Sequence, residues 1–213
     1  MQIDVWSDYA CPWCALGLAR LRVALRDFEH TDEVILVHRA FELHPGAPAR
    51  SAGTAEEVVA RKYGMPLAQV RAGHAQLTAF GAEVDFSFDF GRVRPGSTFD
   101  AHRLTRAARG TEWEDALVRA LFEAHFSEGR QLSDADVLRD VARSVGFPDV
   151  LLDPVLGGEA YRDDVRGDEA AAAELGVTGV PYFLIGGAWP IPGAQDVETL
   201  GIVLERAWSR SAH

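Results

Sequence analysis

The feature that most constrains this 213-residue chain is its cysteine content: it has only two, Cys11 and Cys14, in the motif Cys-Pro-Trp-Cys. A disulfide between them would close too short a loop to stabilise a fold by much. The residues before the pair, Gln2 to Ser7, alternate in polarity and predict a strand. The residues after it, Pro12 to Phe28, carry apolar side chains at helical spacing. We therefore expect the two thiols to lie where a strand ends and a helix begins.

This position favours redox chemistry. A thiolate, rather than a thiol, attacks a disulfide, and the unpaired N–H groups at a helix N-terminus favour the thiolate. We expect Cys11 to be exposed and nucleophilic, and Cys14, one turn further along, to be more buried and to attack second. Half of a zinc site and a pair of inert thiols are the other interpretations. A metal is disfavoured because the chain has no second cysteine pair and no histidines at a paired spacing.

Two more regions predict strands. Val34 to Phe41 is a β-rich run that we expect to be buried on both faces, as inside a parallel sheet. Tyr182 to Ile185, the turn Gly186-Gly187 and Ala188 to Ile191 predict a hairpin. Its second strand is expected at an edge of the sheet because it contains Pro190.

Helical patterns fill most of the remaining chain. They cover Thr54 to Tyr63, Pro66 to Phe80, a stretch from Thr98, Glu112 to Phe126, Ser133 to Val145, Asp149 to Leu156, Glu159 to Leu175 and Asp196 to Trp208. Thr54 with Glu57, and Ser133 with Asp136, are expected to cap two of these helices. Three phenylalanines in an alternating segment are expected to fill the core between helices rather than to line a substrate groove: Phe86, Phe88 and Phe90. Without the helical block after the second strand, the order of elements is that of a thioredoxin fold.

The composition argues against two classes of binding partner, nucleic acids and membranes. The chain has 21 basic and 32 acidic residues, a net charge of −11, and a field of that sign repels nucleic acid. No apolar run approaches the roughly 20 residues of a membrane span. The first residues lack the pattern of an export signal, so we expect a cytoplasmic protein with no membrane or nucleic-acid partner.

A second motif precedes the third predicted strand. Gly179, Val180 and Pro181 stand directly before Tyr182. Most X-Pro bonds are trans, and a proline is tolerated at the first residue of a strand. A cis bond would instead turn the Val180 backbone outward beside Cys11, where an extended substrate could pair with it as an added strand. The residues alone leave both alternatives open.

The two motifs together resemble the DsbA-like branch of the thioredoxin superfamily, and more narrowly its FrnE-type members. The likeness extends from about residue 2 to residue 208. Further segments in the same order carry it: Phe41-Glu42-Leu43-His44-Pro45, Thr98-Phe99-Asp100-Ala101-His102-Arg103-Leu104, Phe126-Ser127-Glu128-Gly129-Arg130 and Gly193-Ala194-Gln195.

The resemblance implies an α/β fold of thioredoxin-like type with a large all-helical insertion. Residues 1–50 and 156–213 would form one discontinuous domain, and residues 51–155 a lid and groove wall over the thiols. It also implies that Cys11 is the nucleophile, Cys14 the resolving thiol and Pro181 a cis proline beside them. No cofactor is implied beyond the cysteine pair, with a low-molecular-weight thiol as a candidate co-substrate.

Near the first cysteine the chain differs from many thioredoxin-fold enzymes. The remaining site candidates have weaker support from the sequence. Many thioredoxin-fold enzymes carry a buried acid six residues before the first cysteine, where this chain has Val5; Asp8 is a nearby acid that could accept a proton. Trp13, between the cysteines, is expected to form an exposed rim for substrate, and Val180 to hold its backbone. Phe99 and His102 are further substrate-contact candidates, although a histidine packed under the lid is also expected there, with a proton relay as the alternative.

The first functional hypothesis is a cytoplasmic thiol-disulfide oxidoreductase, a reductase or isomerase of protein or small-molecule disulfides. A second hypothesis is a thiol-dependent isomerase or transferase of the 2-hydroxychromene-2-carboxylate isomerase (kappa glutathione transferase) type. Those proteins typically have a serine in the site, whereas this chain has two cysteines. A third hypothesis is a non-enzymatic holdase that binds extended chains.

Overall fold

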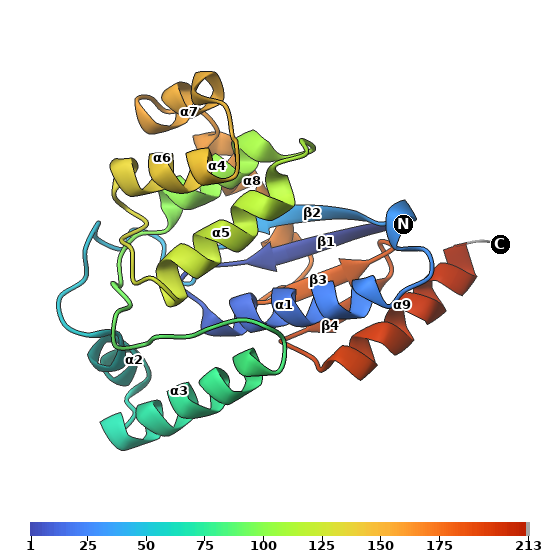
Figure 1. Ribbon diagram of the computed structural model, residues 1–213, viewed down its shortest axis with the longest axis horizontal. Helices are drawn as coiled ribbons and strands as arrows, with labels where there is room; N and C mark the ends of the chain where they lie inside the picture. The colour runs from blue at the N-terminus through green and yellow to red at the C-terminus, as the bar shows by residue number, and fades with distance from the viewer. Residues whose placement is uncertain (212–213) are drawn as a thin grey trace.

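The computed structural model describes residues 1–211 and contains one mixed four-stranded sheet with helices on both faces (Figure 1). The strands are β1 (Gln2–Ser7), β2 (Ile35–Ala40), β3 (Tyr182–Ile185) and β4 (Trp189–Pro192), in the order β2-β1-β3-β4. β1 is parallel to β2 and antiparallel to β3, and β3 is antiparallel to β4. Helix α1 (Pro12–Arg26) makes the parallel connection, which confirms the predicted strand-helix-strand unit.

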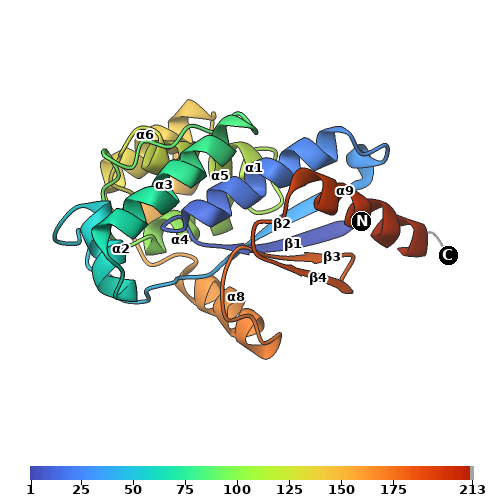
Figure 2. The same cartoon turned by 90° about the horizontal axis from the view of Figure 1, so that it is seen from below.

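Different helices pack on the two faces of the sheet. Figure 2 shows α1 and α9 (Val197–Ser211) on one face and α8 (Arg162–Glu174) on the other. Side chains alternate along β1 accordingly: Val5 belongs to the large core under α1 and α9, whereas Trp6 packs in a smaller cluster with Ala172 of α8. Both sides of β1 are therefore buried.

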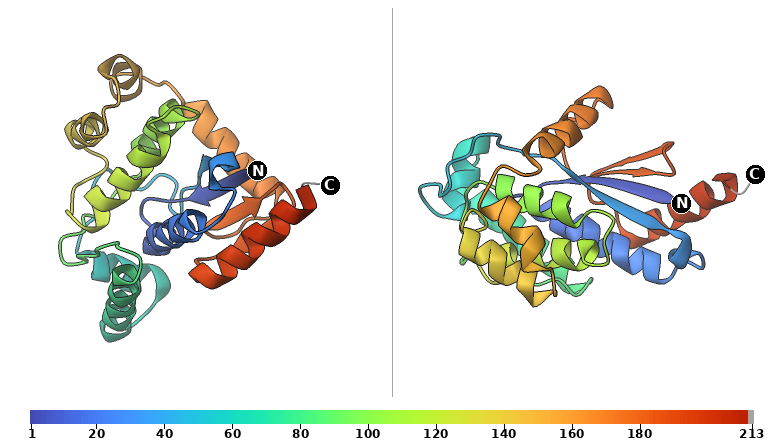
Figure 3. Two further views of the ribbon diagram at one scale, coloured as in Figure 1. Left: turned by 45° about the vertical axis from the view of Figure 1, so that its right-hand side comes forward. Right: turned by 90° about the horizontal axis from the view of Figure 1, so that it is seen from above.

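The insertion contains helices and connecting segments but no strand among its described residues. Its helices are α2 (Ala55–Tyr63), α3 (Leu67–Ala82), α4 (Phe99–Ala108), α5 (Glu114–Phe126), α6 (Ala135–Ser144) and α7 (Asp149–Leu156). They surround the end of the sheet where β1 leads into α1; α2 and α3 lie on one side of α1, and α4 to α7 on the other (Figures 1 and 3). The capping box predicted at Thr54 and Glu57 is present at the start of α2.

One hydrophobic core runs from the sheet through α1 into the insertion. It joins buried residues of α1, such as Leu16, to Leu104 of α4 and Leu121 of α5. Phe86 and Phe88 are buried in this core, in an extended segment between helices, as predicted. Because the core is continuous, the insertion is packed against the helix that carries the cysteines.

A buried carboxylate fastens α8 to the sheet. Asp168 accepts hydrogen bonds from Arg39 of β2 at 3.2 Å and from the Ala40 amide at 3.1 Å. Arg109, directly after α4, pairs with the same carboxylate. The Trp6 indole N–H donates to the Asp168 carbonyl at 3.0 Å. We call this set of contacts the Asp168 joint.

Some sequence expectations were wrong in detail. The run from Val34 to Phe41 is not buried on both faces: within β2 only His38 and Ala40 are buried, and Ile35 is 63% exposed. β2 is also an edge strand rather than an inner one. The cap of α6 is Asp134, whose side chain accepts from the Asp136 amide, rather than the expected pair that began at Ser133. A short 3-10 helix at Thr31–Glu33 was not expected.

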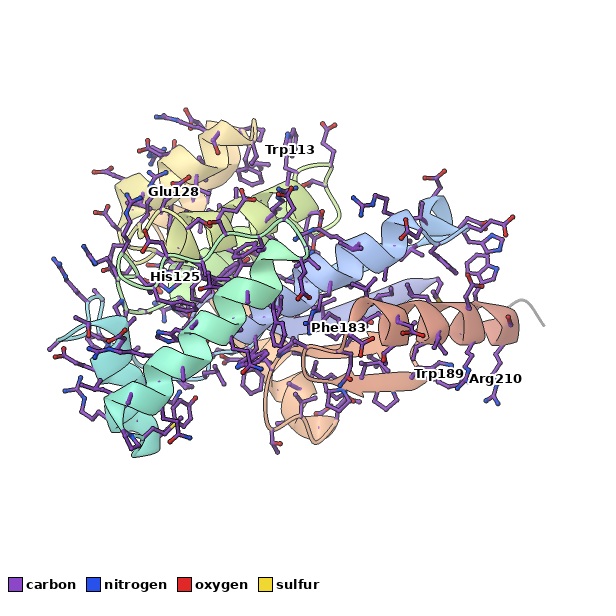
Figure 4. The ribbon with its side chains drawn as sticks, turned by 60° about the horizontal axis from the view of Figure 1, so that its bottom comes forward. Trp113, His125, Glu128, Phe183, Trp189 and Arg210 are labelled. Carbon is purple, nitrogen blue, oxygen red and sulfur yellow. The ribbon has the colours of Figure 1, made fainter. Side chains whose placement is uncertain are left out.

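The hairpin was predicted correctly. Gly186 and Gly187 both have positive φ, 59° and 69°, as the tight turn requires, and β4 is the other edge strand. Its Trp189 lies beside Arg210 of α9, with the guanidinium 5.1 Å from the ring centroid (Figure 4). This end of the molecule is opposite the insertion (Figure 1).

Candidate active site

The predicted placement of the first cysteine is confirmed. Cys11 is the N-cap of α1, with extended dihedrals of −101° and 111°, and Pro12 follows in the first helical position. Its carbonyl accepts hydrogen bonds from the amides of Cys14 at 3.0 Å and Ala15 at 3.4 Å. Proline fits there because its missing N–H would be unpaired at a helix start. Cys11 therefore stands at the N-terminal, positive end of the α1 dipole.

Both thiols are free, and Cys14 is the more buried, as expected. Cys11 itself is only 6% exposed, so the expectation of an exposed Cys11 was wrong. The reason is the backbone opposite: the Cys11 sulfur lies 3.6 Å from the Val180 carbonyl oxygen, within reach of a weak S–H···O hydrogen bond. A substrate can approach this sulfur only along a restricted path.

Cys14 has an environment that holds its proton. Burial, followed by the hydrogen bond and charge of Cys11, raises the pKa of Cys14 well above that of an ordinary thiol. The Asp8 amide donates to the Cys14 sulfur at 3.5 Å, which acts in the opposite direction but is outweighed. At neutral pH Cys14 is therefore a thiol, not a thiolate.

The proline before β3 lies beside the pair. The Val180–Pro181 bond is cis, and the Pro181 carbonyl accepts from the Gly193 amide at 2.8 Å. On the other side is Gly17 of α1, where a Cβ atom would be 3.0 Å from the Pro181 ring. Sequence reasoning missed Gly17; a glycine inside an otherwise apolar helix was the available signal.

Asp8 is fully buried and hydrogen-bonded on all sides. Its Oδ2 accepts from the Leu43 amide at 2.8 Å, and its Oδ1 accepts from the Thr98 hydroxyl at 2.7 Å and the Ala10 amide at 3.1 Å. Burial opposes ionisation, but contact with His102 and these amides outweigh it and lower the pKa of Asp8. A carboxylate with a lowered pKa is a poor proton acceptor, so this environment does not support the proton-accepting role considered for Asp8.

His102 stands behind Asp8 rather than at the surface. Its Nε2 is 3.5 Å from Asp8 Oδ1, an ion-pair contact when the ring is protonated, and its ring centroid is 5.0 Å from that of Tyr9. Nearby Glu42 is buried and paired with Arg166 at 2.6 Å; burial raises its pKa despite this partner. The packed histidine expected under the lid agrees with this geometry, and a substrate contact by His102 stays a prediction.

Trp13 and Phe99, two other substrate-contact candidates, stand at the starts of two different helices. Trp13 is 40% exposed at the start of α1, which suits a rim. Phe99 is half-buried at the start of α4, where its ring lies under the guanidinium groups of Arg162 and Arg166, at 5.0 and 4.5 Å. It thus faces α8, and sequence reasoning gave no indication of these cation–π contacts.

His125 of α5 was not singled out from the sequence. Figure 4 shows it within the insertion. It is buried, and burial lowers its pKa to about 4 although a backbone hydrogen bond with Arg130 and the charge of Asp8 act in the other direction. His125 is therefore neutral at physiological pH, and it faces the same buried region as Asp8.

The described residues include no group of three or more histidine, cysteine, aspartate or glutamate side chains arranged to hold a metal ion. None of the helices within residues 1–211 is long and apolar enough to cross a membrane. A cleft of about 440 Å³ lies between residues 50–54 and 91–95, and neither cysteine lines it.

A free dithiol at the start of the first helix, beside a cis proline that leads into an antiparallel strand, defines a thioredoxin-fold protein built for thiol chemistry. Residues 2–205 match the family model for the DSBA-like thioredoxin domain, and the chain belongs to that family. The expected thioredoxin-like fold with a large helical insertion is thereby confirmed.

Individual relatives agree with this assignment. The crystal structure of a probable DsbA oxidoreductase, SCO1869 from Streptomyces coelicolor, has a TM-score of 0.92 and 38% identity, with 98% of this chain and 90% of that chain covered. The uncharacterized protein YwbO of Bacillus subtilis (strain 168) is 26% identical over 98% of this chain and 96% of its own. A 2-hydroxychromene-2-carboxylate isomerase shares the fold, with a TM-score of 0.74, 16% identity and coverage of 100% and 98%.

Proposed function

We propose that this protein is a cytoplasmic, FrnE-type thiol-disulfide oxidoreductase that reduces or isomerises disulfides of proteins or small molecules. One observation carries the proposal: two free thiols lie one helical turn apart at the start of α1, beside the cis Val180–Pro181 bond. In a reducing compartment, a lone pair of neighbouring cysteines is suited to catalysis rather than to stapling a fold.

The reaction needs only these two sulfurs. The Cys11 thiolate attacks one sulfur of the substrate disulfide, and the other sulfur leaves and takes up a proton. The sulfur–sulfur bond now joins Cys11 to the substrate. Cys14 then loses its proton, attacks the Cys11 sulfur and releases the second substrate thiol. The substrate has gained two electrons and two protons, and the protein holds a Cys11–Cys14 disulfide.

The environments of the two thiols support this order of attack. Cys14 keeps its proton because it is fully buried and its pKa is raised. Cys11 lies at the N-terminus of α1, the end of a helix dipole that favours negative charge. A low-molecular-weight thiol is the co-substrate that we propose for recycling: two thiol molecules reduce the Cys11–Cys14 disulfide and leave as their own disulfide.

Substrate binding is proposed to use the backbone opposite Cys11. The Val180 carbonyl is 3.6 Å from the Cys11 sulfur, so an extended substrate that pairs with this backbone would bring its disulfide to the thiol. Trp13 would form the rim of the site, with Phe99 and His102 as further contacts. The insertion, residues 51–155, would act as the lid and groove wall of a discontinuous domain formed by residues 1–50 and 156–213.

The test is dithiol-driven reduction of insulin by the purified protein. We expect Cys11→Ser to abolish turnover, and Cys14→Ser to stop turnover and accumulate a mixed disulfide at Cys11. The control is Ser209→Ala, a mild substitution in the last turn of α9, which ends at the opposite end of the molecule from the insertion (Figure 1).

Other outcomes would identify another function. Catalysis that tolerates Cys14→Ser would contradict a dithiol cycle and favour the isomerase or transferase chemistry of the 2-hydroxychromene-2-carboxylate type. Binding of extended chains that survives loss of both thiols, without insulin reduction, would favour a holdase.

A further inference from the structure

Asp8 touches both cysteines through its backbone. Its carbonyl accepts a hydrogen bond from the Cys11 amide at 3.0 Å, and its own amide donates to the Cys14 sulfur at 3.5 Å. Any displacement of Asp8 therefore moves the turn that positions both thiols.

The Asp8 side chain reaches two segments that are distant in sequence. One is the loop after β2, through the Leu43 amide at 2.8 Å. The other is the insertion, through the Thr98 hydroxyl at 2.7 Å. Both segments belong to motifs whose role the dithiol cycle leaves unexplained.

Thr98 is used in an unusual way. It occupies the N-cap of α4, where a threonine hydroxyl normally accepts a hydrogen bond from a helix amide, yet it makes no such capping bond. Its hydroxyl contacts Asp8 instead. The Thr98 hydroxyl thereby connects the start of α4 to the cysteine turn and does not cap α4.

The carboxylate has no arginine or lysine partner among the described residues. Its neighbours are amides, the Thr98 hydroxyl and the His102 ring. Its negative charge opposes ionisation of the adjacent Cys14 thiol, in addition to the larger effects of burial and of Cys11. The titratable groups that face this region are His102 of α4, His125 of α5, Glu42 of the loop after β2, Tyr9 and the two thiols.

We propose that Asp8 is a positioning residue that couples the helical insertion to the thiol pair: the start of α4 and the Leu43 loop hold its carboxylate, and its backbone and charge set the reactivity of Cys11. This inference rests on the proposed dithiol function. A substrate or partner that moves α4 would change the reactivity of the thiols through this contact.

Two substitutions test the coupling with opposite expected signs. Asp8→Asn keeps the shape of the side chain but removes the charge that opposes a thiolate, so Cys11 should react faster at low pH. Thr98→Val keeps the charge but removes a hydrogen bond that partly neutralises it, so Cys11 should react more slowly. A purely structural role would move both in the same direction.

The measurement is the rate of Cys11 alkylation by iodoacetamide in the reduced protein, from pH 5 to pH 9. At pH 6 we expect Asp8→Asn to be roughly threefold faster and Thr98→Val roughly twofold slower than wild type. The double variant should match Asp8→Asn alone, because Thr98 acts through Asp8. Shifts in the same direction, or a Thr98→Val effect that persists in the double variant, would overturn the proposal.

Matched controls remove general destabilisation as a cause. Thr105→Val deletes another buried hydroxyl of α4, which contacts Tyr9 rather than Asp8. Asp168→Asn neutralises another buried carboxylate, whose partners are Arg39, Arg109 and the Ala40 amide rather than the cysteine turn. In both control variants the rate of Cys11 alkylation should depend on pH as in wild type. A change of this rate as large as that in Asp8→Asn would contradict the proposal. If Asp8→Asn does not fold, Thr98→Val against Thr105→Val decides the question by the same criterion.

Failure of the proposed function would be visible separately, because alkylation needs no disulfide substrate. If Cys11→Ser left insulin reduction intact while the two shifts appeared as expected, the oxidoreductase proposal would fall and the coupling would stand. If turnover depended on Cys11 but neither shift appeared, the coupling would fall alone.

Discussion

Two buried carboxylates join the helical elements to the sheet, and they are built differently. Asp168 is compensated by two arginines, Arg39 and Arg109, and fastens α8 to β2 and the end of α4. Asp8 is held by neutral donors and a histidine, and fastens the start of α4 to the cysteine turn. Both are nearly inaccessible to solvent.

We expect the first carboxylate to affect mainly the stability of the fold and the second to affect mainly the reactivity of the thiols. A carboxylate that is paired with two arginines contributes to stability through these ion pairs, and its charge has little effect on other neighbouring groups. Its substitution should therefore change mainly the free energy of unfolding. A carboxylate without an arginine or lysine partner beside two thiols alters the cost of forming a thiolate there. Substitutions at the two carboxylates and around them test this contrast.

The largest stability effect is expected at the Asp168 joint. Asp168→Asn leaves Arg39 and Arg109 partly buried with one anionic partner fewer, which should lower the free energy of unfolding by about 3 kcal/mol. Asp8→Asn weakens the hydrogen bonds from Leu43, Thr98 and Ala10 and removes the charged contact with His102, with an expected cost of about 1–2 kcal/mol. Urea unfolding of both reduced variants checks the order. A greater loss for Asp8→Asn would contradict the contrast.

The next effect is a dependence of the free energy of unfolding on pH, caused by the buried His125. His125 takes up a proton near pH 4 in the folded protein and near pH 6.5 when unfolded, because burial disfavours its charged form. The unfolded state therefore binds more protons between these values, and stability falls as the pH falls from about 6.5 to about 4, by up to about 3 kcal/mol. His125→Leu should flatten the pH dependence of unfolding in this window. Equal slopes in wild type and variant would refute this origin.

A smaller effect is expected where α1 meets the cis proline. Gly17→Ala places a methyl group 3.0 Å from the Pro181 ring, so the gain in helix propensity should be cancelled by crowding. Turnover should fall severalfold because Pro181 is displaced from the thiols. Gly73→Ala in α3 is the control: its methyl group meets no atom within 4 Å, and it should add about 1 kcal/mol without loss of activity. A fully active, equally stabilised Gly17→Ala would argue against tight packing at this contact.

The smallest stability effect is expected for Trp13→Ala. Trp13 is substantially exposed, so unfolding should change by no more than about 0.5 kcal/mol. The KM for insulin should rise severalfold, because the rim for an extended chain is lost, while reduction of a small disulfide should keep its rate. Ile202→Ala, an exposed apolar residue of α9, should change neither. An unchanged KM for insulin in Trp13→Ala would remove Trp13 from the substrate site.

Local patterns predicted most of the fold. β1 was placed with its actual limits, the capping box of α2 was read from Thr54 and Glu57, and the two glycines of the hairpin turn have the required positive φ. These features depend on residues that are close in sequence. The exposure of Ile35 was predicted wrongly because an edge position is set by the order of the whole sheet.

The site was predictable only in part, for the same reason. The motif of Cys11 and Cys14 was sufficient to place both at a helix start. The residues that hold Asp8, by contrast, are 35 and 90 positions away, and a backbone amide such as that of Leu43 leaves no trace in the sequence. The partial cover of Cys11 by Val180, 169 positions away, was likewise beyond local reasoning.

The most direct test of the central claim is the redox titration of the two thiols against defined ratios of reduced and oxidised glutathione, followed by mass spectrometry of the acid-quenched protein. The account predicts reversible loss of two hydrogens as a Cys11–Cys14 disulfide forms, with one glutathione disulfide reduced per protein molecule. A pair that stays as two thiols at every ratio, or that stops as glutathione adducts without an internal disulfide, would contradict it.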